Sequence, residues 1–477
     1  MPCKPLSCMY GSFVIPQRVV LAIILHLAMH NAYNLRVVIN IALTEMVKPI
    51  IENSTQVTQD CPGMIQEEGL DIKEGQYNWD SKDQAMIKYI FFIGYFVGHF
   101  PGGWLADRIG ARHVMGTGIL LSALLTLVLP TIITKGGEYW GFIYCVVIRF
   151  FMGLFQGTIM PNISTFLSSW APKSEMAMLG GVAYSGMNLG NIVGMLFTGV
   201  IIYHTNSWSS PFYVWGILTI LWYVLFLLTA FSYPSTHPFI TDKEKEYLQK
   251  NIPKKGGSFK VPWLDILRSC PVLAFMAAQF GHDYVLYAMN TDMPKFVKDY
   301  LKMNIRSNGI ASAMPFVFCW ISAIGCGFFV DSITNRELMS LLAMRKMMTI
   351  IAIIVPAFCN VLSTYVGCSR IGVIILCTVG MFFKGPFWSA SKVNVNDLTR
   401  HYGGILMAII NGMGVWAGFI GSWITGYFTT DGTLQQWRFV FWIMMLIALC
   451  TSCIYLFFAQ AERQDWDYWE GETREED

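Results

Sequence analysis

Apolar residues occur along this chain in long runs that are separated by polar stretches. A helix needs about 20 such residues to cross the hydrocarbon core of a bilayer, and twelve runs come close to or exceed that length. They cover 19–43, 86–105, 114–133, 139–160, 178–203, 212–231, 272–293, 310–330, 347–366, 371–391, 405–428 and 439–458. No region shows the ten-residue alternation of a membrane barrel. The pattern predicts an all-α membrane protein with 12 transmembrane helices.

The composition agrees with a chain that lies mostly in lipid. Of its 477 residues, 54% are hydrophobic and only 13% are charged, whereas soluble domains carry about 25% charged residues. The formal net charge is +2 and there is no basic tail, so nothing favours a nucleic-acid partner. We expect the lipid bilayer to contact most of the surface.

Lysine and arginine indicate the orientation of the chain, because they gather in cytoplasmic loops. If both termini are cytoplasmic, the even-numbered loops and the long central loop hold most of these residues. Four basic residues oppose this orientation: Lys295, Lys298, Lys302 and Arg306. The first loop on the opposite side, 44–85, is acidic and carries a glycosylation sequon at Asn53. The balance predicts cytoplasmic termini and a glycan on Asn53.

The runs form two sets of six on either side of a polar linker over 234–268, in which the Thr241–Glu244 spacing predicts a capped surface helix. The other divisions are a cytoplasmic N-terminus over 1–18, a first half over 19–233, a second half over 269–459 and a cytoplasmic tail over 460–477. Small residues four apart occur in the equivalent fifth and eleventh runs: Gly186, Gly190 and Gly194, then Gly414, Gly418, Ser422 and Gly426. Either stripe alone fits ordinary helix packing, but both together predict two pseudo-symmetric six-helix halves.

The loop after the second run carries Gly103-x-x-x-Asp107-Arg108-x-Gly110-x-Arg112. This motif resembles the signature loop of the major facilitator superfamily. Further stretches resemble solute carrier family seventeen, the anion–cation symporters that include sialin, type I sodium–phosphate cotransporters and vesicular glutamate transporters: Asn78-Trp79-Asp80, Trp170-Ala171-Pro172 and Ile240-Thr241-Asp242. Gly281-His282-Asp283 is most similar to insect putative inorganic phosphate cotransporters. The resemblance implies a major facilitator fold and a transporter rather than an enzyme.

Several charged residues fall within the apolar runs, where insertion of a charge costs about 2.5–3.5 kcal/mol and usually marks a cavity or pathway. The cations are Arg36, Arg149 and Lys384, and the candidate anions are Asp283, Asp292 and Asp397. A surplus of buried positive charge predicts a small anionic substrate, although a fixed acid paired with either arginine is an open alternative. Asn40 follows Arg36 by four residues and shares its helix face.

The resemblance assigns roles to individual residues. It implies that Arg36 binds the substrate anion and that Arg149 belongs to the same site, with Tyr95, His282 and Tyr287 close to it. Sialin and the glutamate transporters have a glutamate tied to proton coupling where this chain has Gln156. Glutamine cannot titrate, so we expect no proton coupling at this position, and Na⁺ becomes the expected coupling ion. Lys88 and His282 depart from the glutamate transporters and make glutamate a poor candidate.

Gating residues are also expected. Asp107, Arg108 and Arg112 lie in the signature loop, where the halves must part. Asp283 and Asp397 are candidates for coupling or gating, and Asp397 has Arg400 or Lys392 as partners or caps its helix. We expect no metal site and no cofactor apart from co-transported Na⁺ or H⁺. Cys61 and Cys368 leave a disulfide open.

The sequence therefore predicts a cation-coupled symporter of inorganic phosphate or a small organic anion, which works by alternating access. A proton-coupled organic anion transporter of the sialin or vesicular type is the alternative. A non-transporting receptor on a transporter fold is the alternative of a different class. The plasma membrane is the expected location, and an endosomal, lysosomal or vesicular membrane stays open.

Overall fold

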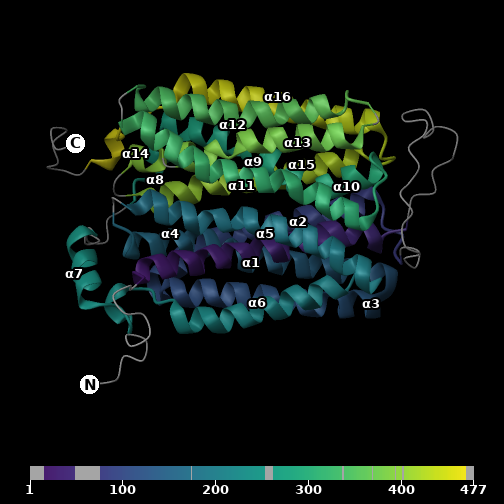
Figure 1. The fold of residues 1–477 in the computed structure, drawn as a ribbon, viewed down its shortest axis with the longest axis horizontal. Helices are drawn as coiled ribbons and strands as arrows, with labels where there is room; N and C mark the ends of the chain where they lie inside the picture. The colour runs from purple at the N-terminus through teal and green to yellow at the C-terminus, as the bar shows by residue number, and fades with distance from the viewer. Residues whose placement is uncertain are drawn as a thin grey trace.

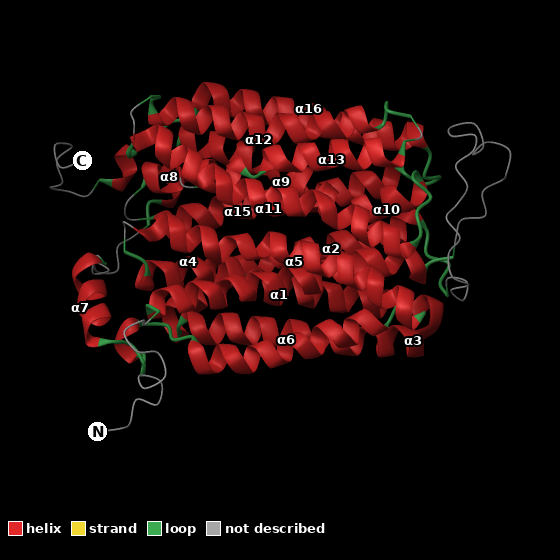
Figure 2. Ribbon diagram, viewed as in Figure 1, coloured by secondary structure: helices red, strands yellow, loops and turns green. Residues whose placement is uncertain are grey.

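The computed structural model describes residues 15–48, 76–172, 175–252, 261–335, 338–367, 369–392, 394–399 and 402–468. Asn53, Cys61, Cys368 and Arg400 lie outside these ranges, and the side chains of Asp107 and Arg108 are not described either. The described chain is almost entirely helical, as Figures 1 and 2 show. The all-α prediction is therefore confirmed.

The first half contains α1 (Gln17–Met46), α2 (Ser81–Ile109), α3 (Ala111–Gly157), α4 (Ile159–Trp170), α5 (Met176–Thr205) and α6 (Ser210–Thr229). The connection holds η3 (Pro234–Thr236), α7 (Asp242–Asn251) and α8 (Trp263–Arg268). The second half contains α9 (Cys270–Thr291), α10 (Met293–Asp299), α11 (Ile305–Asn335), α12 (Leu341–Ser363), α13 (Arg370–Lys384), η4 (Phe387–Ser391), α14 (Asn394–Leu398), α15 (Gly403–Phe428) and α16 (Leu434–Phe458), and η5 (Asp465–Asp467) follows.

Each of the twelve apolar runs lies largely within these helices. Helix α3 contains two of them, which meet at Gly137, where a positive φ of 66° breaks the helix. Six helical stretches in the described part are long and apolar enough to cross a membrane by composition alone: 111–170, 178–205, α6, α12, 405–428 and α16. Among the remaining helices, α1 and α9 carry buried polar residues, which include Arg36, Asn40 and Asp283.

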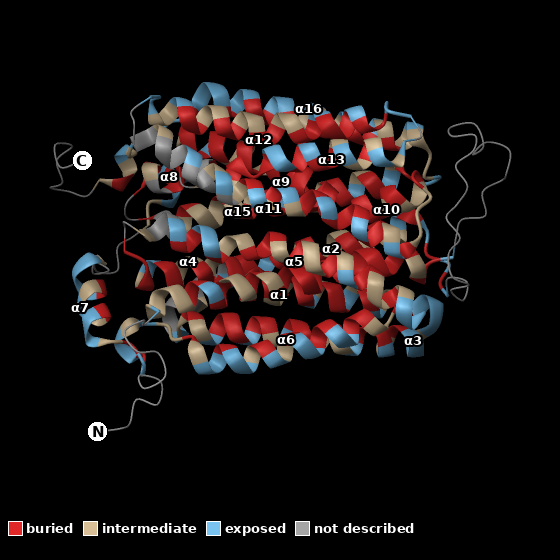
Figure 3. Cartoon of the chain, in the orientation of Figure 1, coloured by how far each residue is buried: buried red, intermediate tan, exposed pale blue. Residues whose placement is uncertain are grey.

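Burial distinguishes inner helices from outer ones (Figure 3). In α1, 21 of 30 residues are buried, and in its counterpart α9 the number is 17 of 22. In α6 only 7 of 20 are buried, and its exposed residues include Leu221 and Leu228, at 60% and 65% exposure. Exposed apolar side chains in such numbers would be unfavourable in water and fit a lipid-facing surface.

The glycine stripes lie where helices approach closely. A Cβ on Gly186 would overlap the backbone of His26 in α1, and a Cβ on Gly426 would overlap Ala85 in α2. The α5 stripe therefore packs within the first half, whereas the α15 stripe also contacts the opposite half. The two halves meet along α5–α11 and α2–α15.

The linker helix α7 lies at one end of the bundle and α10 at the other (Figure 1), and we call these the α7 end and the α10 end. The Thr241 hydroxyl accepts a hydrogen bond from the Glu244 N–H at 3.3 Å, as the capping spacing predicts. The Glu244 carboxylate accepts hydrogen bonds from the backbone N–H groups of Gln17 and Arg18 at 2.9 and 3.1 Å. It therefore caps the start of α1 and holds α7 against the first half.

Candidate functional site

Arg36 lies about two thirds of the way along α1 and is only 2% exposed. Its guanidinium carbon lies 4.3 Å from the ring centroid of Tyr33, 4.7 Å from that of Phe91 and 4.6 Å from that of Tyr95. Tyr33 comes from the previous turn of α1, and the other two rings come from α2. Arginine is attracted to aromatic faces at these distances, so the three rings fix the orientation of the planar group.

The donors of Arg36 are not all used by the protein. Its Nε and Nη1 atoms have no hydrogen-bond partner in the described ranges. No described carboxylate lies within 4.0 Å of its guanidinium nitrogens. The alternative that a fixed acid neutralises Arg36 therefore finds no support among the described residues. A buried charge without a partner is costly, which makes this group a strong attractor for an anion.

Arg149, in the second part of α3, lies beside the same aromatic cluster. Its guanidinium carbon lies 4.7 Å from the Phe91 centroid, and its Nε donates to the Ile87 carbonyl at 3.4 Å. Its Nη1 has no described partner. Gln156, two turns further along, is 1% exposed, and neither atom of its amide has a described partner. The Phe91 ring thus contacts the guanidinium groups of both predicted anion-binding arginines.

A cavity lies between the halves next to this cluster. From the first half it is lined by Tyr33, Tyr95, His99 and Met160; from the second half it is lined by Gln279, Asp283, Leu286, Tyr287, Trp388, Lys392, Asn411 and Val415. The structure thus brings the predicted residues Tyr95, Asp283 and Tyr287 together. The Arg36 guanidinium contacts the rings of two of these lining residues, Tyr33 and Tyr95. Lys392 and Asn411 are lining residues that the sequence did not indicate as substrate contacts.

Asp283 is held in the cavity wall by two neighbours on α9. Its carboxylate accepts hydrogen bonds from the Gln279 amide at 2.6 Å and from His282 Nδ1 at 2.8 Å. The His282 ring stacks on Phe387 at 3.7 Å between centroids, and the His282 carbonyl accepts from Lys384 Nζ at 2.7 Å. The structure therefore places His282, a predicted substrate contact, behind the wall rather than among the described lining residues.

Comparisons with known proteins decide the family. The Major Facilitator Superfamily model matches residues 27–383. The chain is 32% identical to sialin of Ovis aries over 91% of this chain and 87% of sialin, and 30% identical to a putative inorganic phosphate cotransporter of Drosophila ananassae over 93% and 92%. The chain belongs to the major facilitator superfamily and, within it, to solute carrier family 17. The family prediction is confirmed, and the chain is a multi-pass membrane transporter.

A solved structure shows the same fold. A bacterial homologue of the human lysosomal transporter Spinster, in an inward-facing and occupied conformation, superimposes with a TM-score of 0.66 at 10% identity, over 96% of this chain and 100% of that one. This confirms the major facilitator fold.

Charged groups of this transporter join the halves at the α10 end. Lys88 of α2 forms an ion pair with Asp292 at 3.1 Å, and each side chain is 5% exposed. The Asp292 carboxylate also accepts a hydrogen bond from Thr425 of α15 at 3.0 Å. Lys295 of α10 donates to the Ser81 hydroxyl of α2 at 3.2 Å. The sequence identified the charges but not these partners, because they lie far apart along the chain.

Asn40, predicted to share the anion site, also joins the halves. Its amide nitrogen donates to the Asn290 carbonyl of α9 at 3.0 Å, and its amide oxygen has no described partner. Asp397 forms an ion pair with Arg345 of α12 at 3.0 Å. Of the two partners that the sequence suggests for Asp397, Lys392 donates to Asn411 instead, and Arg400 lies outside the described residues.

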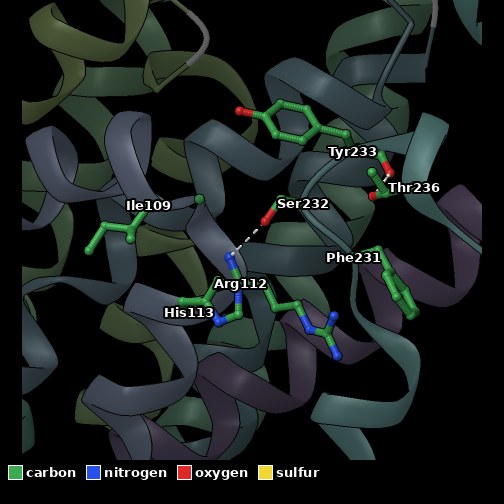
Figure 4. Close-up of a pocket in the computed structure, with 8 residues that line it drawn as sticks. Ile109, Arg112, His113, Phe231, Ser232, Tyr233 and Thr236 are labelled. Atoms are coloured by element: carbon green, nitrogen blue, oxygen red, sulfur yellow. Dashed lines mark hydrogen bonds between the residues drawn. The ribbon is translucent and has the colours of Figure 1, made fainter.

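Arg112 is the signature-loop residue whose side chain is described. It lines a pocket at the α7 end, formed where α3 begins and α6 has ended (Figure 4). Its backbone N–H donates to the Ser232 hydroxyl at 3.2 Å, and its guanidinium donates to the Leu227 carbonyl and lies 4.5 Å from the Phe231 centroid. Arg112 therefore ties the start of α3 to the end of α6 and stabilises the last carbonyls of α6.

Proposed function

We propose that this transporter is a symporter that couples a cation gradient to the uptake of inorganic phosphate or a small organic anion. The observation that supports it most directly is Arg36, a buried guanidinium with unpartnered donors beside a cavity between the halves. A guanidinium presents a planar fork of donors that matches two oxygens of a phosphate or carboxylate. The names of the relatives, which include a putative inorganic phosphate cotransporter, favour the same class of substrate.

The balance of charge around the cavity supports an anion. Arg36, Arg149 and Lys392 supply positive charge, and Asp283 is the acid in the described lining. The carboxylate of Asp283 is stabilised by its own neighbours on α9. An incoming anion would therefore meet a net positive site in a medium of low dielectric constant, where charge interactions are strong.

Alternating access is supported by the closure at the α10 end. Lys88–Asp292 and Lys295–Ser81 cross between the halves there. Among the described residues of the α7 end, the Arg345–Asp397 pair lies within the second half. We infer that the substrate reaches the cavity from the α7 end in this conformation, and that rocking of the halves opens the α10 end.

The signature loop is proposed to control this exchange, because it connects α2 and α3 at the α7 end. Asp107→Asn should slow turnover while it leaves anion affinity unchanged, and Asp107, Arg108 and Arg112 should behave alike in this respect. The measurement is a comparison of transport rate with equilibrium anion binding. Lost binding at a normal rate would contradict the gating role.

Na⁺ is the proposed coupling ion. Gln156 occupies a fully buried position, and its amide has no group that titrates at physiological pH. Proton coupling would therefore need another group, such as His282. Na⁺-independent, proton-driven uptake that His282→Ala abolishes would favour the alternative of a proton-coupled organic anion transporter. Beyond the co-transported cation, the proposed mechanism needs no cofactor.

For the membrane, we propose that the α7 end and both termini face the cytosol and that the protein resides in the plasma membrane, with endosomal, lysosomal or vesicular membranes as alternatives. The acidic loop with Asn53 then faces outward. An endoglycosidase should lower the mass of the wild type but not that of Asn53→Gln. Access of an epitope in this loop only from the cytosol would overturn the orientation.

Uptake into proteoliposomes tests the whole proposal. Purified protein is reconstituted and offered radiolabelled phosphate, urate, sialate, glutamate or an aromatic anion, with and without an inward Na⁺ gradient, and with a proton gradient as a separate condition. We expect one class of anion to accumulate above equilibrium only when Na⁺ is supplied. Binding without accumulation of any anion would instead favour a receptor on a transporter fold.

A further inference from the structure

The tenth apolar run is not a continuous α-helix. Helix α13 ends at Lys384, and after Gly385 and Pro386 the chain forms the π-helical turn η4. The Lys392 N–H donates to the Phe387 carbonyl at 3.0 Å, which is the i→i−5 bond of a π-turn. Pro386 has no N–H to continue the α-helical pattern. Such turns are often found at functional sites, and this one places Trp388 and Lys392 in the cavity lining.

The hydrogen-bond and ring contacts that the described structure gives Lys392 are with neutral groups. Its ammonium group donates to the amide oxygen of Asn411 and lies 5.2 Å from the Trp388 centroid. Asp283, the acid in the same lining, accepts from His282 and Gln279, and no described carboxylate comes within 4.0 Å of the Lys392 nitrogen. Neither the Asn411 amide nor the Trp388 ring neutralises the charge of the Lys392 ammonium. This cation in the cavity wall is therefore available to an anion.

Lys384 provides a contrast within the same run. It is fully buried, its ammonium donates to the His282 carbonyl at 2.7 Å, and it is absent from the described lining. Its bond joins α13 to α9 behind the cavity. The two lysines therefore have different surroundings although both belong to one apolar run, which makes Lys384 a matched control for Lys392.

We propose that Lys392 is a second anion anchor, which binds from the second half the substrate that Arg36 binds from the first. This inference rests on the proposed function. The two groups would act differently, because the Arg36 fork engages two oxygens whereas the Lys392 ammonium is a compact point charge that can contact a further oxygen. The preferred substrate is an anion with oxygens on more than one side, such as phosphate or a carboxylate that carries a second oxygen-bearing group.

A substrate held in this way joins the two halves. Arg36 belongs to α1 of the first half, and Lys392 follows η4 in the second. An anion between them attracts both, so it stabilises the conformations in which the halves lie close to it. An empty site lacks that attraction and leaves the two cations to repel each other. Substrate binding would thus favour the closed intermediate of the transport cycle.

The test compares four variants in proteoliposomes, with radiolabelled phosphate and radiolabelled sialate as the two probes. Lys392→Met should raise KM about ten- to a hundred-fold, the range expected for one charge-assisted hydrogen bond. Lys392→Arg keeps the charge and should restore most of the affinity. Asn411→Asp preserves shape but places a carboxylate beside Lys392, so it should raise KM although the lysine is intact. Lys384→Met should lower thermal stability in detergent and leave the KM of the folded protein unchanged.

The outcomes separate this inference from the proposed function. If wild type accumulates an anion and Arg36→Ala abolishes that accumulation, the proposed function stands. In that case, a KM within twofold of wild type for Lys392→Met overturns the second anchor. Equal rises in KM for Lys384→Met and Lys392→Met overturn it as well, because they indicate a structural effect. If Lys392→Met does not fold, a normal KM for Asn411→Asp is the overturning result.

Discussion

Substitution of Arg36 is the most direct test of the anion site. Arg36→Lys keeps a positive charge but removes the planar fork of donors and the stacking against Tyr33, Phe91 and Tyr95. Arg36→Met removes the charge and keeps a long side chain of similar length among the rings. The pair therefore separates the contribution of geometry from that of charge, and Arg36→Ala removes both.

The structure sets the size of the expected effects. Because Nε and Nη1 of Arg36 have no described partner, a bound anion can engage both. Loss of one charge-assisted hydrogen bond costs about 1.5–3 kcal/mol, and each 1.4 kcal/mol is about tenfold in affinity. Arg36→Lys, which keeps one contact, should therefore bind about ten- to a hundred-fold more weakly. Arg36→Met and Arg36→Ala should lose accumulation altogether.

Arg36→Met should not destabilise the substrate-free protein, although it abolishes accumulation of the anion. An unpaired buried charge is costly because it has been taken out of water, and an apolar residue of similar volume does not carry that cost. Without substrate, Arg36→Met should therefore melt at the same temperature as wild type or higher. With phosphate at about 100 times Kd, wild type should gain about 2.7 kcal/mol from binding, and Arg36→Met should gain nothing.

The assay is thermal unfolding in detergent with and without the anion, together with uptake into proteoliposomes at matched protein abundance. Wild-type anion affinity in Arg36→Ala would falsify the site and leave Arg149 or Lys392 as the primary anchor. A large drop in the melting temperature of substrate-free Arg36→Met would show that the arginine has a structural partner.

Three further predictions concern other parts of the molecule. Lys88→Met leaves Asp292 buried without its cationic partner, which costs about 3–5 kcal/mol in stability, so cysteines introduced at the α10 end should react faster with a thiol reagent added from outside. The exchanged pair Lys88→Asp with Asp292→Lys should restore protection. Unchanged labelling in Lys88→Met would contradict the role of this ion pair in closing the α10 end. Gln156→Glu should give uptake a pH dependence that wild type lacks, and superimposable pH profiles would remove position 156 from coupling. The Arg18 guanidinium, hydrogen-bonded to Glu175 at 2.6 Å, holds the pKa of that carboxyl below its ordinary value. The stabilisation is therefore complete at neutral pH and is lost as the pH falls through the lowered pKa. Glu175→Gln should be about 1 kcal/mol less stable than wild type at pH 7, with a difference that disappears in acid; a constant difference would argue against the ion pair.

The sequence by itself was sufficient for the class of protein and the candidate anion-binding arginines. The apolar runs are a local property of the chain, and their length follows from the thickness of the bilayer. A charge within such a run is conspicuous wherever the run packs, so Arg36 and Arg149 were identified before any fold was known. The repeated small residues in the fifth and eleventh runs likewise indicated two related halves.

Only the tertiary structure decided which charges are paired. Lys88 and Asp292 are separated by 204 positions, and their contact depends on how α2 packs against the junction of α9 and α10. The same holds for Asp397, which forms an ion pair with Arg345 from another helix. Pairing between helices follows from packing, and hydrophobic periodicity says little about it when a helix is apolar on nearly every side.

The cavity lining also depended on tertiary structure. An α-helical reading of the tenth run fixes the relative directions of Lys384 and Lys392, but the π-turn at Phe387–Ser391 changes the phase of the helix between them. One lysine is therefore buried against the His282 carbonyl, and the other reaches the space between the halves. The hydrophobic pattern of the run does not indicate such a change of phase. Only the packed helices show which lysine faces the cavity.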